Sequence, residues 1–435
     1  MTITQHLKKN ISLAVPVMIG QLGHIMVSVA DTAMVGKVGV IPLAGATFAN
    51  TFFSLLMIFG IGVSYAITPF VAATDGADKP KLLTYLQNGF VVNVVMGVII
   101  TAVALSVTPF LEFFGQEPSV AFAARSYLFI ISFSLLPIMV FQTFRQFAEG
   151  KSNTFHPMIV SVSANLLNIG LNYVFIFGKF GFQPMGLDGA GYATLISRVV
   201  MAVFMIVLIK KEWKGFRWQF DKTIIERLFK LGIPSGLQYI FEVSAFAVAA
   251  IMIGWLGAEE LAAHQIALNM AAVTYMAATG IAAASQIRIG NQMGLRDKET
   301  LRVAGYSCFI LVAVFMAFCG LVFILFRDFL PSLYIDNTEV ETLAAVLLVV
   351  AAAFQISDGL QAVGLGVLRG LTDVKIPTLV TFLAFWVFAI PGGYVLGFTF
   401  QLGVLGVWYA LSAGLTIAAV LHIIRFNRLS KRLQF

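Results

Sequence analysis

Charged residues are scarce in this chain: Lys, Arg, Asp and Glu make up 11% of its 435 residues, whereas about 25% is usual for a soluble domain. Apolar side chains take their place and account for 59% of the residues before the 38 glycines are counted. A water-soluble globule could not bury so large an apolar share. The composition therefore excludes the soluble classes and predicts a protein that crosses a membrane many times.

The chain has few cysteines, and two common short motifs of hydrolytic enzymes are absent from it. The only two cysteines, Cys308 and Cys319, lie in one apolar run, so we expect buried thiols rather than a disulfide. No H-E-x-x-H or G-x-S-x-G motif occurs. We therefore expect no enzyme and no cofactor; a membrane-embedded prenyltransferase or protease is the weaker alternative.

Long apolar runs separated by Gly, Pro or charge clusters fill most of the chain. A helix needs about 20 residues to span a bilayer, and twelve runs reach that length. They lie at about 11–35, 44–73, 84–111, 119–147, 154–178, 187–209, 230–256, 261–290, 301–326, 338–368, 375–399 and 403–426. Because a helix satisfies its own backbone in lipid, we expect twelve transmembrane helices.

Successive connections between the spans lie on opposite sides of the membrane, and Lys and Arg are concentrated on one of those sides. The termini and the connections on their side hold 23 of the 28 basic residues, and one more, Arg198, lies inside the sixth span. The opposite side holds the remaining four, Lys37, Arg125, Lys179 and Arg327. By the positive-inside rule, we expect a multi-pass protein of the cell inner membrane with both termini in the cytoplasm.

The second half of the chain repeats the first. A shift of 218 residues aligns Pro16 with Pro234, Met34 with Met252 and Gly62 with Gly280, and a shift of 220 aligns Gly150, Ser152 and Pro157 with Gly370, Thr372 and Pro377. Six spans per half give both halves the same orientation. We expect an all-α integral membrane protein with two pseudo-symmetric six-helix bundles around a central cleft: an amino-terminal lobe 1–210, a cytoplasmic linker 211–229 and a carboxy-terminal lobe 230–435. Two bundles that rock about a cleft favour transport.

Three acids lie within spans: Asp31, Glu242 and Asp358. A charge at the centre of a membrane helix costs at least ~2.5–3.5 kcal/mol, so such residues normally face an interior cavity and serve a function. Gln238 and Gln361 lie one turn from Glu242 and Asp358 respectively. Carboxylate and amide oxygens suit Na⁺ or a shared proton. The alternative is a structural hydrogen bond, or a pair with Arg198.

Further polar residues mark the fifth and sixth spans. Asn165, Asn168 and Asn172 form a stripe at helical spacing, and Thr194 lies in the next span. They are candidate companions of Asp31, although adhesion between helices explains an Asn stripe equally well. We expect Arg198 to pair with an acid or to snorkel to the interface, and His24 and His264 to make ordinary polar contacts.

Aromatic and sulfur-containing side chains are abundant, with 40 Phe and 16 Met. Most must face lipid or the packed interior, yet a minority suffices to line a pocket. Aromatic faces and Met sulfurs beside a few acids favour bulky, flat cations through cation–π and adaptable apolar contact.

The chain resembles the multidrug efflux transporters of the MATE family, and specifically the NorM branch. The resemblance rests on P-V-M-I-G-Q-L and V-A-D-T-A-M-V-G around Asp31, on Y-I-F-E-V-S-A-F around Glu242, and on F-Q-I-S-D-G-L-Q-A-V-G-L-G-V-L-R-G around Asp358. It implies export of cationic drugs in antiport with Na⁺ or H⁺. It also implies a cation site at Glu242 and Asp358, with Na⁺ as a candidate metal there, and an amino-lobe site at Asp31 with Asn168, Asn172 and Thr194.

One departure from the resemblance bears on the ion. Some members carry a Tyr one turn before the acid of span ten, where this chain has Phe354, and its missing hydroxyl leaves Na⁺ and H⁺ both open as coupling ions. The expected partners are cationic drugs or dyes and membrane lipid, with no nucleic acid, and we expect a monomer. A flippase for lipid-linked precursors is the alternative within the same superfamily, and an ion channel is a further alternative.

Overall fold

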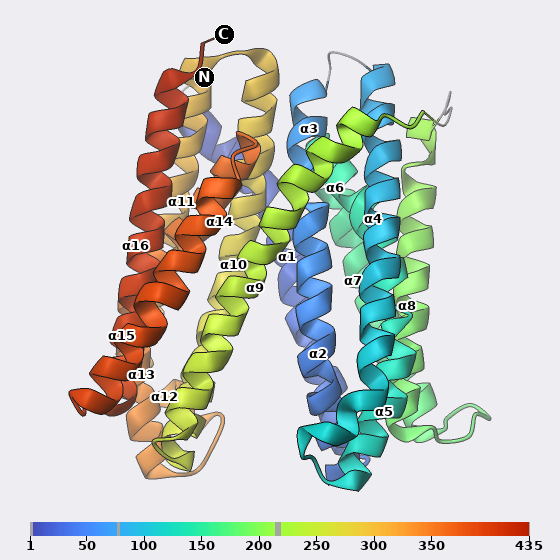
Figure 1. Ribbon diagram of the computed structural model, residues 1–435, viewed down its shortest axis with the longest axis vertical. Helices are drawn as coiled ribbons and strands as arrows, with labels where there is room; N and C mark the ends of the chain where they lie inside the picture. Colours follow the sequence, from blue (N-terminus) through green and yellow to red (C-terminus); the bar gives the residue numbers. More distant parts are fainter. Residues whose placement is uncertain (1–2, 76–78, 214–218, 435) are drawn as a thin grey trace. The chain divides into compact units, whose positions relative to one another are not determined.

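The computed structural model describes residues 3–75, 79–213 and 219–434, and these residues form helices joined by short connections (Figure 1). Twelve helical segments are long and apolar enough to cross a membrane, as predicted. They are Ile3–Gly36, Val40–Thr74, Pro80–Phe114, Pro118–Gly150, Phe155–Phe177, Gly186–Leu208, Lys222–Gly254, Ala258–Leu295, Lys298–Leu325, Thr338–Gly370, Lys375–Thr399 and Gly403–Arg432. Several extend past the predicted ends by a turn or more, because polar residues continue the helix beyond the apolar run.

The chain forms two compact units. The amino-terminal unit comprises residues 19–236, and the carboxy-terminal unit comprises residues 1–18 and 237–435. The predicted lobes follow chain order, whereas the units exchange the first halves of two long helices, α1 (Ile3–Gly36) and α9 (Lys222–Gly254). The exchanged pieces, 1–18 and 219–236, are separated by the same 218 residues as the sequence repeat. Residues 214–218 of the predicted linker lie outside the described residues.

Each unit is built from a corresponding set of helices. Besides its parts of α1 and α9, the amino-terminal unit contains α2 (Val40–Ser64), α3 (Ile67–Thr74), α4 (Lys79–Val107), η1 (Thr108–Phe114), α5 (Pro118–Ser132), α6 (Leu135–Gly150), α7 (Phe155–Phe177), α8 (Gly186–Leu208) and η2 (Lys210–Trp213). The carboxy-terminal unit contains α10 (Ala258–Leu295), α11 (Lys298–Leu325), α12 (Phe329–Ser332), α13 (Thr338–Gly370), α14 (Lys375–Phe382), η3 (Leu383–Ala389), α15 (Ile390–Tyr394), η4 (Val395–Thr399) and α16 (Gly403–Arg432).

The repeat is visible in glycine contacts that recur in both units. A Cβ atom added to Gly62 of α2 would lie 2.6 Å from Cα of Gly236 on α9, and one added to Gly280 of α10 would lie 2.9 Å from the backbone N of Met18 on α1. Both distances are too short for a side chain, so the two glycines allow close helix packing. Gly236 and Met18 are themselves repeat equivalents, which confirms the predicted register.

The helices that end at Gly150 and Gly370, which are equivalent in the repeat, end in the same conformation. Ser152 and Thr372 adopt left-handed φ values of 60° and 59°. After Gly150, the Ser152 N–H donates to the Glu149 carbonyl at 2.8 Å, and the Thr372 N–H donates to the Arg369 carbonyl at the same distance. A left-handed residue just past the last turn is a common helix stop; here a hydroxyl residue fills the position that usually carries Gly.

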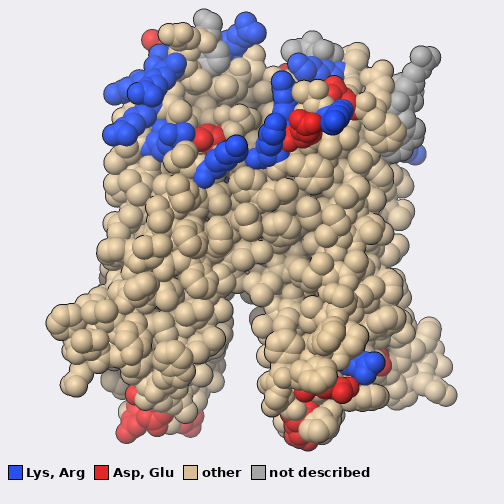
Figure 2. Space-filling model, viewed as in Figure 1, with Lys and Arg blue, Asp and Glu red and all other residues tan. Residues whose placement is uncertain are grey.

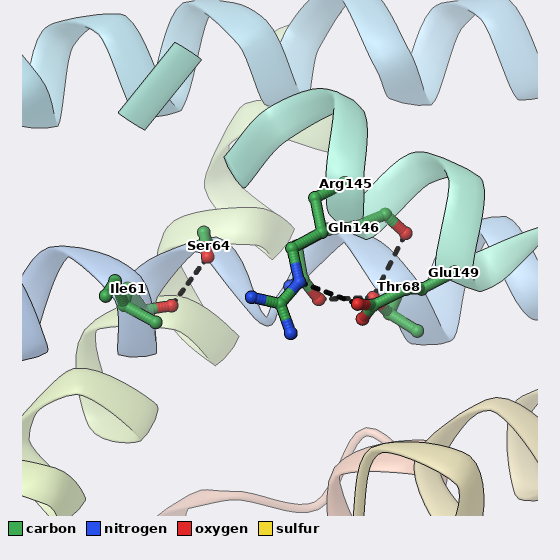
Figure 3. Close-up of polar contacts among 6 residues, drawn as sticks. All are labelled: Ile61, Ser64, Thr68, Arg145, Gln146 and Glu149. Atoms are coloured by element: carbon green, nitrogen blue, oxygen red, sulfur yellow. Dashed lines mark hydrogen bonds and ion pairs between the residues drawn. The ribbon is translucent and has the colours of Figure 1, made fainter. Parts of the chain in front are cut away.

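A break divides the second membrane-crossing segment into α2 and α3 at Tyr65 and Ala66. Ser64 donates its hydroxyl to the Ile61 carbonyl at 2.6 Å just before the break, and Thr68 beyond it donates to the Gln146 side-chain oxygen of α6, also at 2.6 Å (Figure 3). On α6, Arg145 pairs with the buried Glu149 at 2.7 Å. These polar contacts fix α3 against α6 where the backbone ladder of α2 stops.

The surface of each unit has the polarity of a membrane-crossing bundle. Charged side chains gather toward the ends of each unit, and the stretch between them is uncharged on the face that Figure 2 shows. Large apolar residues such as Val98 on α4 and Val314 and Phe318 on α11 are exposed. Such a surface suits lipid and would be unfavourable in water.

The glycine contacts generate a prediction about stability. Gly62→Leu and Gly280→Leu should each destabilise the folded protein by roughly 1–3 kcal/mol, because overpacking forces the helices apart. The expected result is a lower melting temperature and a lower yield of monodisperse protein after detergent extraction.

Gly170→Leu is the matched control, because the space around Gly170 on α7 is open within 4 Å. Gly170→Leu should melt like the unmodified protein. If all three variants melt alike, the glycine contacts do not hold the helices together.

Candidate functional site

Two of the predicted acids lie inside the carboxy-terminal unit. Glu242 on α9 is 5% exposed and Asp358 on α13 is 6% exposed. Glu242 lies shortly past the point where α9 joins this unit, and α10, which supplies a further residue to the site, packs along α13. Neither carboxylate points outward to the lipid-facing surface.

Glu242 is held by two hydrogen bonds from other helices. The Tyr275 hydroxyl of α10 donates to Oε1 at 2.9 Å, and the Gln361 side-chain amide of α13 donates to Oε2 at 3.3 Å. Asp358 lies one helical turn before Gln361 on the same helix, α13. In this cluster of Glu242, Asp358 and Gln361, the Gln361 side chain bonds Glu242 and lies one helical turn from Asp358.

Neither carboxylate of this cluster has an ion-pair partner among the residues that the structure describes. The nearby guanidinium of Arg369 instead donates to the Gln238 side-chain oxygen at 3.4 Å and to the Tyr239 hydroxyl at 3.3 Å. Its charge also lies 5.1 Å from the Tyr239 ring centre. Gln238, predicted as a companion of Glu242, thus binds Arg369.

Arg198 is the one basic residue that the sequence analysis placed inside a span, yet two further basic residues are buried. The alternation of basic residues places Arg369 and Arg288 in cytoplasmic connections, yet both lie within helices and are 5% and 4% exposed. Arg288 bonds His6 and Asn10 of α1, at 2.8 and 3.2 Å. Arg369 lies just past the predicted run 338–368, because α13 continues to Gly370, whereas Arg288 lies inside the predicted run 261–290 and was assigned to the connection although it belongs to the span.

Tyr275 is the site residue that the sequence analysis missed. Phe354, where some relatives of the resemblance carry Tyr, is buried with its ring 5.5 Å from that of Trp408. Tyr275 supplies the hydroxyl from a different helix. The available signal was a single phenol within the long apolar run of α10, since a buried Tyr hydroxyl normally needs a polar partner.

The eleventh membrane-crossing segment is an irregular helix that contacts α9 beside Glu242. The eleventh span contains two π-helical segments, η3 and η4, on either side of the Pro391 turn. Trp386 of η3 donates its indole N–H to the Phe241 carbonyl at 3.1 Å, next to Glu242 in sequence. Because π segments are uncommon and often occur at functional sites, this contact favours a fixed position for Glu242.

The amino-terminal unit brings together the other predicted set. Asn172 donates to Asp31 and, at 3.1 Å, to the Asn168 side-chain oxygen. Asn168 in turn donates to Thr194 at 3.4 Å and to Ser197 at 3.3 Å. Asp31 on α1, the Asn stripe on α7 and Thr194 on α8 therefore form one connected polar network.

This network borders a cavity of about 280 Å³ lined by residues that include His24, Asp31, Asn165, Asn168, Thr194 and Arg198. Arg198 has no ion-pair partner among the described residues, contrary to the expected pair with an acid, and it lines this cavity. Its guanidinium donates to the Ser134 hydroxyl at 2.8 Å and contacts the Met57 sulfur at 3.3 Å. His264 accepts a hydrogen bond from Trp408 at 3.1 Å, the kind of polar contact predicted for it.

Comparison with known proteins extends over nearly the whole chain. The family model MatE matches residues 16–174 and 234–395. The chain is 33% identical over 429 residues to "Multidrug resistance protein NorM" of Photobacterium profundum, covering 96% of this chain and 94% of the relative. It is 31% identical over 440 residues to "Multidrug resistance protein MdtK" of Photorhabdus laumondii, covering 97% and 95%.

Solved structures share the fold at lower sequence identity. The crystal structure of the eukaryotic MATE transporter AtDTX14 has a TM-score of 0.88 and 21% identity, covering 99% of this chain and 98% of that one. A structure titled as the outward-facing conformation of a multidrug resistance MATE family transporter of the MOP superfamily has a TM-score of 0.90 and 20% identity, covering 99% and 97%. The two halves of six helices are common to this fold.

Proposed function

Because the chain belongs to the MatE family, we propose that it is a secondary active multidrug transporter that exports lipophilic cationic compounds in antiport with Na⁺ or H⁺. The observation that carries this proposal is the pair of buried carboxylates on α9 and α13, neither of which has an ion-pair partner in the described part of the chain. A buried acid without a counter-ion is costly, and binding a cation removes that cost.

The chemistry of the cluster suits a small cation. Glu242 and Asp358 supply carboxylate oxygens, and the side-chain oxygen of Gln361 is buried without a hydrogen-bond partner. Na⁺ prefers such hard oxygen ligands, and a proton can occupy either carboxyl group. The Tyr275 hydroxyl provides one further oxygen beside Glu242. The donor set therefore supports either ion, and transport measurements decide between them.

Coupling follows from competition for the same acids. If a cationic drug and the ion each neutralise Glu242 and Asp358, binding of one lowers the affinity for the other by the same factor in both directions. With the cell interior negative, each inward positive charge releases about 2.3 kcal/mol per 100 mV, and the ion gradient adds to this. Ion entry then displaces the drug, which leaves on the outer side.

The amino-terminal network is proposed as a second polar site in the same transporter. Asp31 carries its charge, and Asn168, Asn172 and Thr194 form the hydrogen-bond network that holds it. We propose that both termini lie in the cytoplasm, because 23 of the 28 basic residues lie on the predicted side of the termini. We further propose that the chain works as a monomer in the inner membrane.

Removing either carboxylate charge should stop efflux. Glu242→Gln and Asp358→Asn should each reduce ethidium efflux at least about tenfold, because the neutral amide no longer attracts either cation. The assay uses everted membrane vesicles, energised in one arm by a Na⁺ gradient and in the other by a pH gradient. Glu226→Gln, an exposed site on the same helix α9, is the matched control and should retain full efflux.

Two outcomes would contradict the proposal. Efflux that persists in both variants would show that neither carboxylate is needed for transport. Efflux by the unmodified protein that depends on neither the Na⁺ gradient nor the pH gradient would exclude antiport with these ions and favour the flippase.

The hydroxyl of Tyr275 should affect the affinity for the coupling ion without being required for transport. Tyr275→Phe keeps the ring but deletes the hydrogen bond to Glu242. We expect the ion concentration for half-maximal efflux to change about tenfold or more, because one hydrogen bond to a charged group contributes about 1.5–3 kcal/mol, with ethidium efflux retained at saturating gradient. An unchanged ion dependence would show that Tyr275 acts only in packing.

The orientation is testable by labelling. In a background with Cys308 and Cys319 replaced by alanine, Lys179→Cys should react with a membrane-impermeant maleimide in intact cells. Glu299→Cys should react only after the membrane is permeabilised, because Lys179 and Glu299 lie on opposite predicted sides. The reverse pattern would invert the topology.

A further inference from the structure

A buried guanidinium lies about one helical turn from the candidate cation site of the carboxy-terminal unit. Arg369, in the last turn of α13, donates to the Gln238 side-chain oxygen at 3.4 Å and to the Tyr239 hydroxyl at 3.3 Å. These two residues precede Glu242 on α9 by four and three positions, so all three share one face of that helix. One turn of α-helix rises about 5.4 Å. The positive charge therefore lies close to Glu242, on the side toward the start of α9.

The contacts of Arg369 with α9 hold its charge in place without joining it to the acid. Gln238 and Tyr239 are neutral, and the guanidinium carbon lies 5.1 Å from the Tyr239 ring centre. Glu242 accepts its hydrogen bonds from other helices and forms no ion pair with any described residue. The guanidinium thus acts on the carboxylate through space, and the carboxylate oxygens remain available to a transported cation.

The sequence repeat shows that the helix end itself does not need an arginine. The equivalent of Arg369 is Glu149, which pairs with Arg145 of its own helix at 2.7 Å, and the equivalent of Glu242 is His24. Nevertheless α6 and α13 end in the same conformation. The arginine and the buried acid therefore occur together in one half and are both absent from the equivalent positions of the other. This pairing favours an electrostatic role for Arg369 beside Glu242.

The electrostatic effect on a bound cation has a definite sign. A cation at Glu242 and Asp358 is repelled by Arg369, and after the cation leaves, the same guanidinium stabilises the empty carboxylates. In a protein interior such effects extend over one or two helical turns. Both effects lower the affinity for a cation. A transported ion must bind well enough to enter a site and weakly enough to leave it, and two buried acids alone would favour entry only.

We infer that Arg369 is a built-in countercharge that weakens cation binding at Glu242 and Asp358, so that ion and drug can exchange there. This rests on the proposed function, since it regulates the cation site proposed above. Arg369 contributes no ligand to the cation. It sets the affinity of the site from the side that faces the predicted cytoplasmic end of α9.

The test measures the affinity of the site for an organic cation. The dissociation constant of tetraphenylphosphonium is determined with purified protein in lipid nanodiscs, at fixed pH without Na⁺. Arg369→Gln should bind about tenfold or more tightly, because it removes a unit charge from the neighbourhood of the site. Arg369→Lys keeps the charge and should stay within about threefold of the unmodified protein. Because tighter binding acts mainly through slower release, maximal ethidium efflux should fall in Arg369→Gln.

A second variant leaves the arginine in place. Gln238→Glu is nearly isosteric and puts a carboxylate where the Gln238 oxygen already accepts from Arg369, so it should neutralise the guanidinium and also tighten binding. Arg302→Gln is the matched control, because the Arg302 guanidinium donates to neutral Asn427 of α16 at 3.2 Å, away from α9. It should bind tetraphenylphosphonium like the unmodified protein.

Tighter binding is the readout that a merely structural role would not give, since a disturbed site binds more weakly. Arg369→Gln decides where it folds, and Gln238→Glu decides otherwise; unchanged or weaker binding in the deciding variant overturns the inference. Glu242→Gln in the same assay separates the two hypotheses. If it weakens binding while the deciding variant does not tighten it, only this inference fails. If it leaves binding unchanged, the cation does not use this acid, and the proposed function fails together with the inference.

Discussion

The cost of a charge in hydrocarbon is the constraint on which the structure depends. Lipid offers no water to solvate a carboxylate or a guanidinium, so each buried charge must find a partner, a cavity or a transported ion. The first two solutions are visible in the structure, and we propose the third for Glu242 and Asp358. Glu149 has Arg145 at 2.7 Å, Arg198 lines a cavity, and Glu242 accepts hydrogen bonds from two neutral donors. The unpaired acids are therefore the sites with capacity for an external cation.

A second constraint is the repeat, which determines how each unit is assembled. Close helix contact needs residues without bulk, and the same register supplies them twice, at Gly62 and Gly280. The same helix stop, with a hydroxyl residue in a left-handed conformation, follows Gly150 and Gly370. The charges are not symmetric between the units, because Glu149 of one unit is acidic whereas its equivalent in the repeat, Arg369, is basic. Duplication thus provides the scaffold, and later divergence provides different chemistry in the two units.

Apolar run length and the repeat allowed the twelve spans and the two halves to be predicted, because both depend on properties that are local in sequence. Helical spacing predicted which polar residues share a face of one helix, such as Asp358 with Gln361 and Asn168 with Asn172. The grouping of Glu242 with Asp358, and of Asp31 with Asn168, Asn172 and Thr194, was expected from the resemblance to the MATE family. Tyr275, the burial of Arg369 and the exchange of helix halves could not. Each depends on which helices pack together and on how far a helix continues past its apolar run, and neither is encoded by local spacing.

The central claim is that drug and ion bind the same carboxylates, and equilibrium binding tests it most directly. Binding of tetraphenylphosphonium to the purified protein is measured during a Na⁺ titration at fixed pH, and during a pH titration without Na⁺. The account predicts that the dissociation constant rises in proportion to the concentration of at least one ion, and that this dependence disappears when Glu242 and Asp358 are replaced by Gln and Asn. A dissociation constant that is unchanged across both titrations of the unmodified protein would contradict it.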